Sequence, residues 1–371
     1  MTTKINAVSQ STIPGGSTGL TRKYHSIIDS TPSHLLNRPI VDSSGAFLQS
    51  ELELLDPKLH LPLTWTTFSE DLLPRAGFTI DDEFVSWTNS TFGATDNLGT
   101  ATKSWLGLEG QDSPEVAVDI FKQVNMPGIW SKSASWTFVE LSKAAKLQRP
   151  IDVDKLEAIQ KIWNLDADNQ AYLGDPSKGL FGIANASVAD GNTKAWAVTE
   201  SINSTLGGWV AAFTANPTAA AQEILNDLRL IDNAIWANSG YTSPATKFLI
   251  PSSAWSILNM PVAISGVPIA ISIREYFEKT ASIAASMGST VKLVPRKWLN
   301  STIPGTGYGN TLASNRVVGY VDDYDYVRFE YTPLISTPIW VQGMRQSVTY
   351  YGNLGGVELV YPSTVGYLSQ V

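Results

Sequence analysis

The side chains best suited to catalysis or metal binding are three histidines near the start of the chain. They are His25, His34 and His60, in a sequence of 371 residues that contains no cysteine. A metal site or a general base needs partners at short, defined spacings, and no such partner accompanies these histidines. The lack of cysteine excludes disulfides, iron–sulfur clusters, thiolate zinc sites and cysteine nucleophiles. We therefore expect surface or packing roles for the histidines.

Two glycine-rich stretches and one aspartate cluster resemble reactive motifs but lack the required context. Residues 15–19 match GxSxG, yet no strand and helix flank them as a nucleophile elbow requires. Residues 305–309, GTGYG, lack the Lys-Ser/Thr and the following helix of a phosphate cradle. The cluster of Asp322, Asp323 and Asp325 lacks the Gly and Glu of a calcium loop, which favours a solvated β-turn. We therefore predict no catalytic residue, no cofactor and no metal, and hence a protein that is not an enzyme.

Composition narrows the class of protein further. Charged residues make up 16% of the chain, aromatic residues 10%, and the formal net charge is −8. A nucleic-acid reader would need a basic surface for phosphates, so sequence-specific DNA or RNA binding is disfavoured. The first residues lack the apolar stretch of a signal peptide, and no segment is apolar enough for a membrane span. We expect a soluble protein made in a cytoplasm, whose 12 tryptophans serve mainly as core and interface anchors.

The elements that organise the chain lie in residues 133–182. A short strand around Trp136 and Phe138 leads into a helical segment at 141–147, which Pro150 interrupts. A long amphipathic helix follows, capped by Asp152 or Asp154 and ended near Leu173 by Gly174. Its apolar stripe is Leu156, Ile159 and Trp163.

The segments before this scaffold have little means of forming a core. Residues 1–75 mix short apolar clusters with prolines and are predicted to form an extended arm. Apolar and polar residues alternate at 84–92 and again at 114–124, with a polar stretch at 95–108 between them. This pattern predicts a two-stranded β-ribbon, which is marginal alone in water and would dock on another surface.

Later segments read as mixed helices and strands. A helix is predicted from Pro217, capped by Thr214 or Asn216, to residue 238, with Ile224, Leu228, Ile231 and Ile235 on one apolar stripe. A third helix is predicted at 272–288. Strands are predicted at 247–251, at 291–295 and on both sides of the aspartate turn. Residues 347–368 read as a closing, hairpin-like pair of strands.

The order of these segments resembles the major capsid proteins of tailed bacteriophages with the HK97 fold, an α+β fold. The closer resemblance is to the phage capsid group that carries the domain of unknown function DUF2184. The matching segments lie between about residue 45 and residue 371, and their order is the signal: FVELSKAAKL (138–147), AYLGDPSKGLFGIAN (171–185), FLIPSSAWSIL (248–258), RVVGYVDDYDYVRF (316–329) and GGVELVYPSTVGYL (355–368).

The resemblance implies a division into four regions. They are an N-terminal arm at about 1–75, an extended β-hairpin (E-loop) at about 76–128, a peripheral P-domain at about 129–215 and 331–371 with a spine helix at about 154–173, and an axial A-domain at about 216–330. The arm and the ribbon would bury their aromatic residues on neighbouring subunits. The candidates for inter-subunit contact are Trp87, Phe92, Lys103, Trp105, Phe121 and Trp130. Lys103 also falls where some relatives carry the lysine of an isopeptide crosslink, but no motif for its asparagine partner is present.

The implied function is that of a major capsid protein, a structural protein that self-assembles into pentamers and hexamers. These would form the icosahedral head shell that encloses phage DNA. The partners would be further copies of the chain, a separate scaffolding protein, a portal, decoration proteins and double-stranded DNA held non-specifically, but no membrane. The protein would occupy the virion capsid, after assembly in the host cytoplasm.

Two alternatives stay open from the sequence. An encapsulin-like protein cage shares the fold and would enclose enzyme cargo. A β-rich virion adhesin or sugar-binding protein would stay a small oligomer and expose its tryptophans to ligand.

Overall fold

A computed structural model describes residues 64–94, 116–147, 151–264, 267–303 and 312–371. The chain divides into two units, residues 1–62 and 63–371, and the described residues belong to the second unit. The three histidines, the GxSxG stretch, residues 305–309 and most of the predicted arm lie outside the described residues. Among the helices described, none is long and apolar enough to cross a membrane.

The first sheet is built on one strand of fifteen residues, β16 (Arg345–Leu359). All ten residues of β4 (Gly128–Thr137) pair antiparallel with β16, from Arg345–Thr137 to Leu354–Gly128. β13 pairs with the other end of β16, and three short strands complete the sheet. β13 spans Val327–Tyr331, and the three short strands are β1 (Leu73–Pro74), β14 (Ile335–Ser336) and β15 (Trp340–Gln342).

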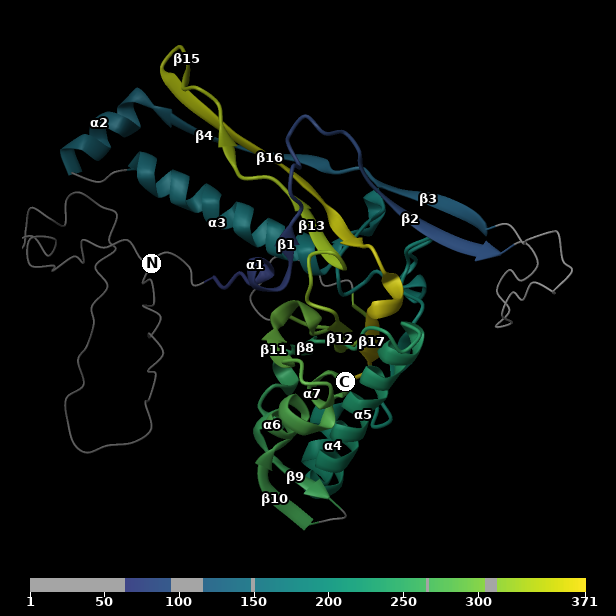
Figure 1. Ribbon diagram of the computed structural model, residues 1–371. Helices are drawn as coiled ribbons and strands as arrows, with labels where there is room; N and C mark the ends of the chain where they lie inside the picture. Colours follow the sequence, from purple (N-terminus) through teal and green to yellow (C-terminus); the bar gives the residue numbers. More distant parts are fainter. Residues whose placement is uncertain (1–63, 95–115, 148–150, 265–266, 304–311) are drawn as a thin grey trace, which may run out of the picture. The chain divides into compact units, whose positions relative to one another are not determined.

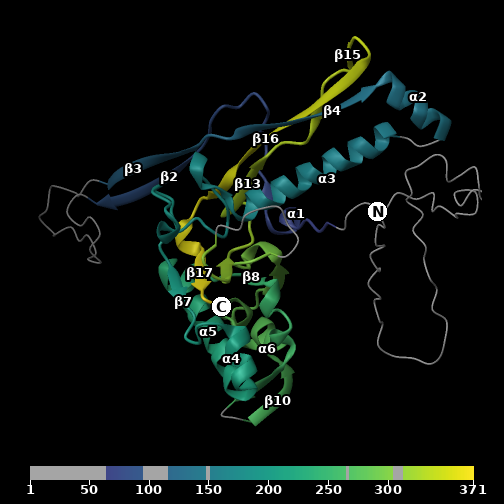
Figure 2. The ribbon, with the colours of Figure 1, turned by 180° about the vertical axis from the view of Figure 1, so that it is seen from behind.

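The predicted long helix is α3 (Ile151–Tyr172), which runs along β4 and β16 (Figures 1 and 2). Trp163 of its apolar stripe packs on Gly352 of β16, where an added Cβ would lie 2.7 Å from the indole. Gly174 follows the helix with a φ of 64°, in agreement with the predicted stop. The predicted cap at Asp152 or Asp154 is wrong, because the helix already begins at Ile151 and contains both.

The helix before α3 begins earlier than predicted, because β4 runs directly into α2 (Phe138–Leu147). Thr137 and Glu140 form a capping box at this junction. The Thr137 N–H donates to Glu140 Oε2 at 2.9 Å, and the Glu140 N–H donates to Thr137 Oγ1 at 3.1 Å. This reciprocal cap moves the helix start to Phe138.

The second sheet has the order β11-β8-β12-β17-β7 and is covered by α5 (Pro217–Asn238). Asn216 caps α5 by accepting from the Ala219 N–H, as one of the two predicted caps. The apolar stripe of α5 is fully buried, and Ile235 lies directly on Gly319 and Gly366 of the sheet. The strands are β7 (Ser201–Asn203), β8 (Lys247–Pro251), β11 (Lys292–Arg296), β12 (Arg316–Tyr320) and β17 (Gly366–Ser369).

The third predicted helix is broken into short pieces. It consists of α6 (Ile273–Tyr276), a π-turn at Phe277–Ala281 and α7 (Ile283–Ser286). Ser282 has extended backbone between the last two and caps α7 by accepting from the Ala285 N–H. The hydroxyl thus competes with helix continuation, which the apolar pattern alone does not reveal.

The predicted β-ribbon is confirmed as β2 (Val85–Ala94) paired antiparallel with β3 (Val116–Asn125), while its tip lies outside the described residues. The remaining described elements are short: α1 (Phe68–Asp71), α4 (Trp209–Ala215), β5 (Gly174–Asp175), β6 (Leu180–Phe181), β9 (Pro261–Ile264), β10 (Val267–Ser272), and 3₁₀ turns at Pro176–Lys178, Val188–Asp190, Ser252–Ala254, Ile257–Asn259, Lys297–Leu299 and Pro362–Thr364.

Three strands lie in a different sheet from the one that the predicted domain boundaries assign to them. β13 lies in the first sheet although its residues fall largely in the predicted A-domain, and β7 and β17 lie in the second sheet although they fall in the predicted P-domain. The predicted closing pair is therefore wrong, since β17 pairs with β12 and β7 rather than with β16. Alternation of side chains identifies a strand, but it does not identify the partner of that strand.

Candidate inter-subunit surfaces and their anchors

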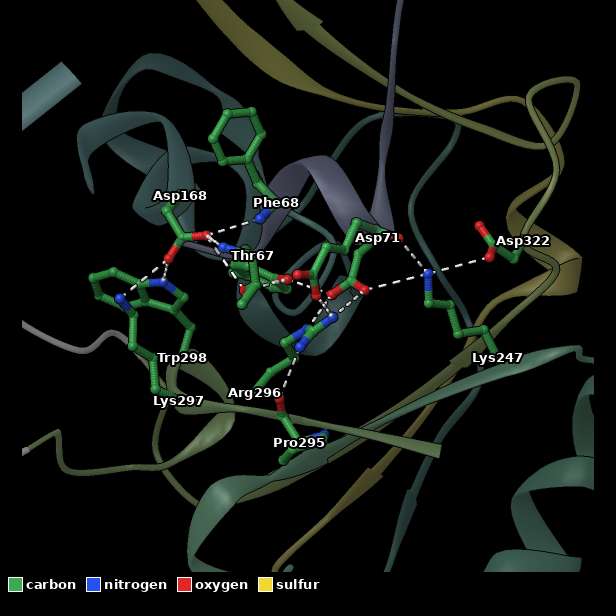
Figure 3. Close-up of polar contacts among 12 residues, drawn as sticks. Thr67, Phe68, Asp71, Asp168, Lys247, Pro295, Arg296, Lys297, Trp298 and Asp322 are labelled. Carbon is green, nitrogen blue, oxygen red and sulfur yellow. Dashed lines mark hydrogen bonds and ion pairs between the residues drawn. The ribbon is translucent and has the colours of Figure 1, made fainter. Parts of the chain in front are cut away.

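The segment that joins the predicted arm to the fold is held by two buried aspartates, Asp71 and Asp168 (Figure 3). Asp71, at the end of α1, accepts from the guanidinium of Arg296, with Nη2 2.6 Å from Oδ1. Lys247 lies 3.2 Å from the same oxygen, and the Tyr172 hydroxyl donates to Oδ2. Asp71 thus joins α1 to α3 and to β8 and β11 of the second sheet.

Asp168, on α3, holds the other end of the same short helix. Its Oδ1 accepts from the backbone N–H groups of Thr67 and Phe68 at 2.8 and 2.9 Å. Its Oδ2 accepts from the Trp298 indole at 2.6 Å and lies 3.2 Å from Lys297 Nζ (Figure 3). A carboxylate at this end of α1 satisfies amides that the helix leaves unpaired.

Burial and the negative charge of Asp71 shift the pKa values of the neighbouring Arg296 and Tyr172. Burial lowers the pKa of the Arg296 guanidinium, but its hydrogen bonds to Asp71 and the nearby negative charge raise the pKa by more. Burial and the charge of Asp71 raise the pKa of Tyr172 well above its usual value. These groups fix the position of residues 64–75, and we assign them a structural role.

The ribbon differs from this anchored segment, because its apolar side chains are left exposed. Ile120 is 71% exposed and Phe121 is 54% exposed, on opposite faces of β3. Val118 and Phe84 are exposed as well. Apolar residues on both faces of a two-stranded ribbon are typical of a segment that is covered by another chain.

A second exposed apolar patch lies at the far end of the first sheet, in and beside the hairpin between β15 and β16. We name this set of residues the distal patch: Phe138, Val139, Ile339, Trp340, Val341 and Met344. Trp340 is 65% exposed. The two parts of the patch are joined by a hydrogen bond from the Phe138 N–H to the Met344 carbonyl at 3.1 Å.

The sequence-predicted contact residues have different positions. Trp87 is only 6% exposed and packs on Trp196 of its own chain, with ring centroids 5.9 Å apart, so we no longer propose it as a contact. Trp130 is partly buried, donates its indole N–H to Asp166 at 2.7 Å and lines a hollow of about 280 Å³. Phe121 is exposed on the ribbon. Phe92 lies in β2, but its side chain is outside the described part of the structure. Lys103 and Trp105 lie wholly outside the described residues.

Sequence reasoning missed the distal patch and both anchoring aspartates. A signal for the patch was present, because Ile339, Trp340 and Met344 flank Gly343, and large apolar residues are unusual beside a turn. No comparable signal marked Asp71 or Asp168, whose partners are more than a hundred residues away for the most part.

The aspartate cluster at 322–325 is a turn, as predicted. Asp322 pairs with Lys247 at 3.1 Å, and Asp323 Oδ1 accepts from the Asp325 N–H at 2.9 Å. Within the described ranges, no group of three or more acidic or histidine side chains could hold a metal ion.

A family model for major capsid proteins matches residues 100–371. The chain belongs to the major capsid protein family. No curated protein matches its sequence. As a capsid protein it is a shell-forming structural protein of the virion, and the family match decides against the adhesin alternative.

Solved capsid structures share the fold of this capsid protein. The capsid of the Myoviridae phage XM1 superposes with a TM-score of 0.65 at 14% identity, covering 88% of this chain and 99% of that one. The capsid of a native GTA particle gives 0.55 at 12% identity, covering 90% and 99%. The SrpI encapsulin of Synechococcus elongatus gives 0.50 at 11% identity, covering 86% and 93%. The capsid protein therefore has the predicted HK97-like α+β fold, which phage capsids and encapsulins share.

Proposed function

We propose that this capsid protein forms pentamers and hexamers that close into the icosahedral head shell of a tailed phage around double-stranded DNA. The observation that carries the proposal is the ribbon of β2 and β3, whose apolar side chains are exposed on both faces. Burial of apolar surface contributes about 25 cal/mol per Å², so covering these side chains would favour association. In pentamers and hexamers, one surface of each copy binds a different surface of the next, and such heterologous contacts form a ring when the rotation between copies closes.

The proposed contact residues of the ribbon are Val118, Ile120 and Phe121, together with the predicted Phe92, Lys103 and Trp105. Trp130 on β4, which is partly exposed, also remains a proposed contact. The distal patch is a second proposed contact surface. It lies at the β15 end of β16, whereas the ribbon root packs beside the other end, which supports contacts with two different neighbours. Many weak contacts of this kind add through multivalency.

Further partners follow from the same proposal. They are a separate scaffolding protein, a portal and decoration proteins, with assembly in the host cytoplasm. The net charge of −8 supports a shell that encloses DNA without binding it tightly. We also propose the division into arm, E-loop, P-domain and A-domain, with β13 moved to the P-domain sheet and β7 and β17 to the A-domain sheet.

Negative-stain electron microscopy of the purified chain, alone and with its co-expressed scaffold, tests the proposal. We expect closed shells, or rings with five-fold and six-fold views. A protein that stays a monomer or trimer under all these conditions would contradict it.

Deletion of residues 95–108 tests the ribbon itself, because this segment joins its two strands. We expect a folded, soluble subunit that no longer closes shells. Normal particles from this deletion would show that assembly does not require the ribbon tip. Particles that contain protein cargo and no DNA, when isolated from the native source, would favour the encapsulin alternative, whose fold is the same.

A further inference from the structure

Two fully buried glutamates lie beneath the root of the ribbon. Glu330 is on β13 and Glu358 is on β16, and these strands pair antiparallel with Arg328 opposite Glu358. Glu330 Oε2 accepts from the N–H of Gly356, which lies two residues before Glu358 on β16, so the two acidic side chains lie near each other. Because like charges disfavour each other, the negative charge of Glu358 favours the neutral form of Glu330.

Glu358 is the member of the pair that faces cations. It forms ion pairs with Arg75 and with Arg328, the latter at 3.0 Å. Arg75 also donates to the Ser86 carbonyl of β2 at 2.9 Å. Through Arg75, the charge on Glu358 therefore holds the first strand of the ribbon.

Glu330 is hydrogen-bonded by neutral donors instead. Its Oε1 accepts from the Asn125 side chain at 3.0 Å, and its Oε2 accepts from the Gly356 N–H at 3.3 Å. Asn125 is the last residue of β3, so Glu330 holds the second strand of the ribbon. An added Cβ at Gly355 would lie 2.1 Å from Glu330 Oε2, so glycine at 355 leaves room for this carboxyl group.

We propose that Glu330 and Glu358 form a proton-dependent latch that fixes the direction in which the ribbon leaves its own subunit. The charged groups that face the pair are Arg75, from the segment before β2, and Arg328 on β13. Asn125 on β3 and the backbone of Gly356 on β16 supply its neutral contacts, and the backbone of Phe181 on β6 packs on Gly356. The latch concerns the ribbon root and does not depend on which surface the ribbon meets.

The direction of the pH effect follows from the contacts. Burial and the charge of Glu358 raise the pKa of Glu330 well above its usual 4.5. The neutral form of Glu330 is therefore favoured in the folded chain. Its contribution to stability is complete below the unfolded pKa and is lost as the pH rises through the raised folded pKa. The hydrogen bonds from Asn125 and Gly356 favour the ionised form, but burial and the charge of Glu358 outweigh them. The latch is closed when Glu330 is protonated and opens as Glu330 ionises, because burial and Glu358 disfavour the ionised carboxylate at this site.

The lack of cysteine makes a direct test possible. Spin labels are attached to Ser90→Cys on β2 and Ser133→Cys on β4, both exposed positions, and pulsed EPR measures the distance between them in the full-length chain. We expect a narrow distance distribution at acidic pH and a broader or shifted one at alkaline pH, since ionisation of Glu330 opens the latch.

Three variants separate the latch from a merely structural role. Glu330→Gln keeps a neutral side chain, so the distribution stays narrow at every pH. Glu358→Gln removes the like charge, so the transition moves to lower pH; it also removes the ion pair with Arg75, so the distribution below the transition is broader than in the wild type. Asn125→Ala removes the tie to β3 and broadens the distribution at every pH, while circular dichroism reports whether each variant folds. A wild-type distribution that does not change with pH, or a Glu330→Gln variant that responds to pH like the wild type, would overturn the latch.

Discussion

The sheet under α5 and the β2–β3 ribbon contain similar apolar residues but place them differently. Ile235 of α5 is fully buried against two strands of its own chain, whereas Ile120 of the ribbon is 71% exposed. The first region completes its core within one subunit, while the second leaves its apolar surface uncovered. We infer that the buried sheet under α5 determines the stability of the subunit and that the exposed ribbon determines assembly.

The largest loss of stability is expected where charges are buried at the edge of the sheet under α5. Asp71→Asn leaves Arg296 and Lys247, both nearly fully buried, without their shared anionic partner. Removing one member of a buried ion pair costs about 3–5 kcal/mol. Chemical denaturation should show this loss, whereas Glu275→Gln, which breaks the exposed pair with Lys279, should change the midpoint little. Equal midpoints for the two variants would show that the Asp71 network does not stabilise the fold.

The contrast between the two isoleucines can be measured directly with the same substitution. Ile235→Ala opens a cavity above Gly319 and Gly366 and should cost about 2–5 kcal/mol of unfolding free energy. Ile120→Ala should change the unfolding free energy by less than about 0.5 kcal/mol, because the side chain is exposed. Similar losses for the two variants would mean that the ribbon is covered within the subunit, which would contradict the comparison.

A smaller, pH-dependent effect is expected at Asp232 of α5, whose Oδ2 accepts from the Ile283 N–H at 2.8 Å. Burial raises the pKa of Asp232 to about 6. Because the folded chain holds the proton more tightly than the unfolded chain, stability should fall as the pH rises from about 4 to about 6. The fall is about 3 kcal/mol at most, from a pKa difference of about two units. Thermal unfolding should show this slope, and Asp232→Asn should reduce it; an unchanged slope in the variant would assign it to other groups.

The sequence was informative about local elements and less informative about long-range partners. Trp163 and Ile235 were predicted to lie on apolar helix stripes, because a repeat of 3.6 residues is visible in one segment. The partner of β17 and the contacts of Asp71 depend on residues far along the chain, and no local pattern encodes them. Trp87 shows the same limit for the contact surfaces, since its alternation placed it on a strand but could not reveal that Trp196 covers it.

The smallest expected effect on stability should accompany the largest effect on assembly. Val118 of the ribbon and Val188, which is outside the ribbon, are equally exposed at 59%. Val118→Asp and Val188→Asp should therefore change subunit stability similarly and little. If the ribbon is covered by a neighbour, a charge at position 118 must be buried without a partner, so Val118→Asp should reduce the yield of closed particles in sedimentation and electron microscopy. Val188→Asp should assemble like the wild type. Equal yields from the two variants would mean that this part of the ribbon stays solvent-exposed in the shell, and the distal patch would then become the stronger candidate for the contact that drives assembly.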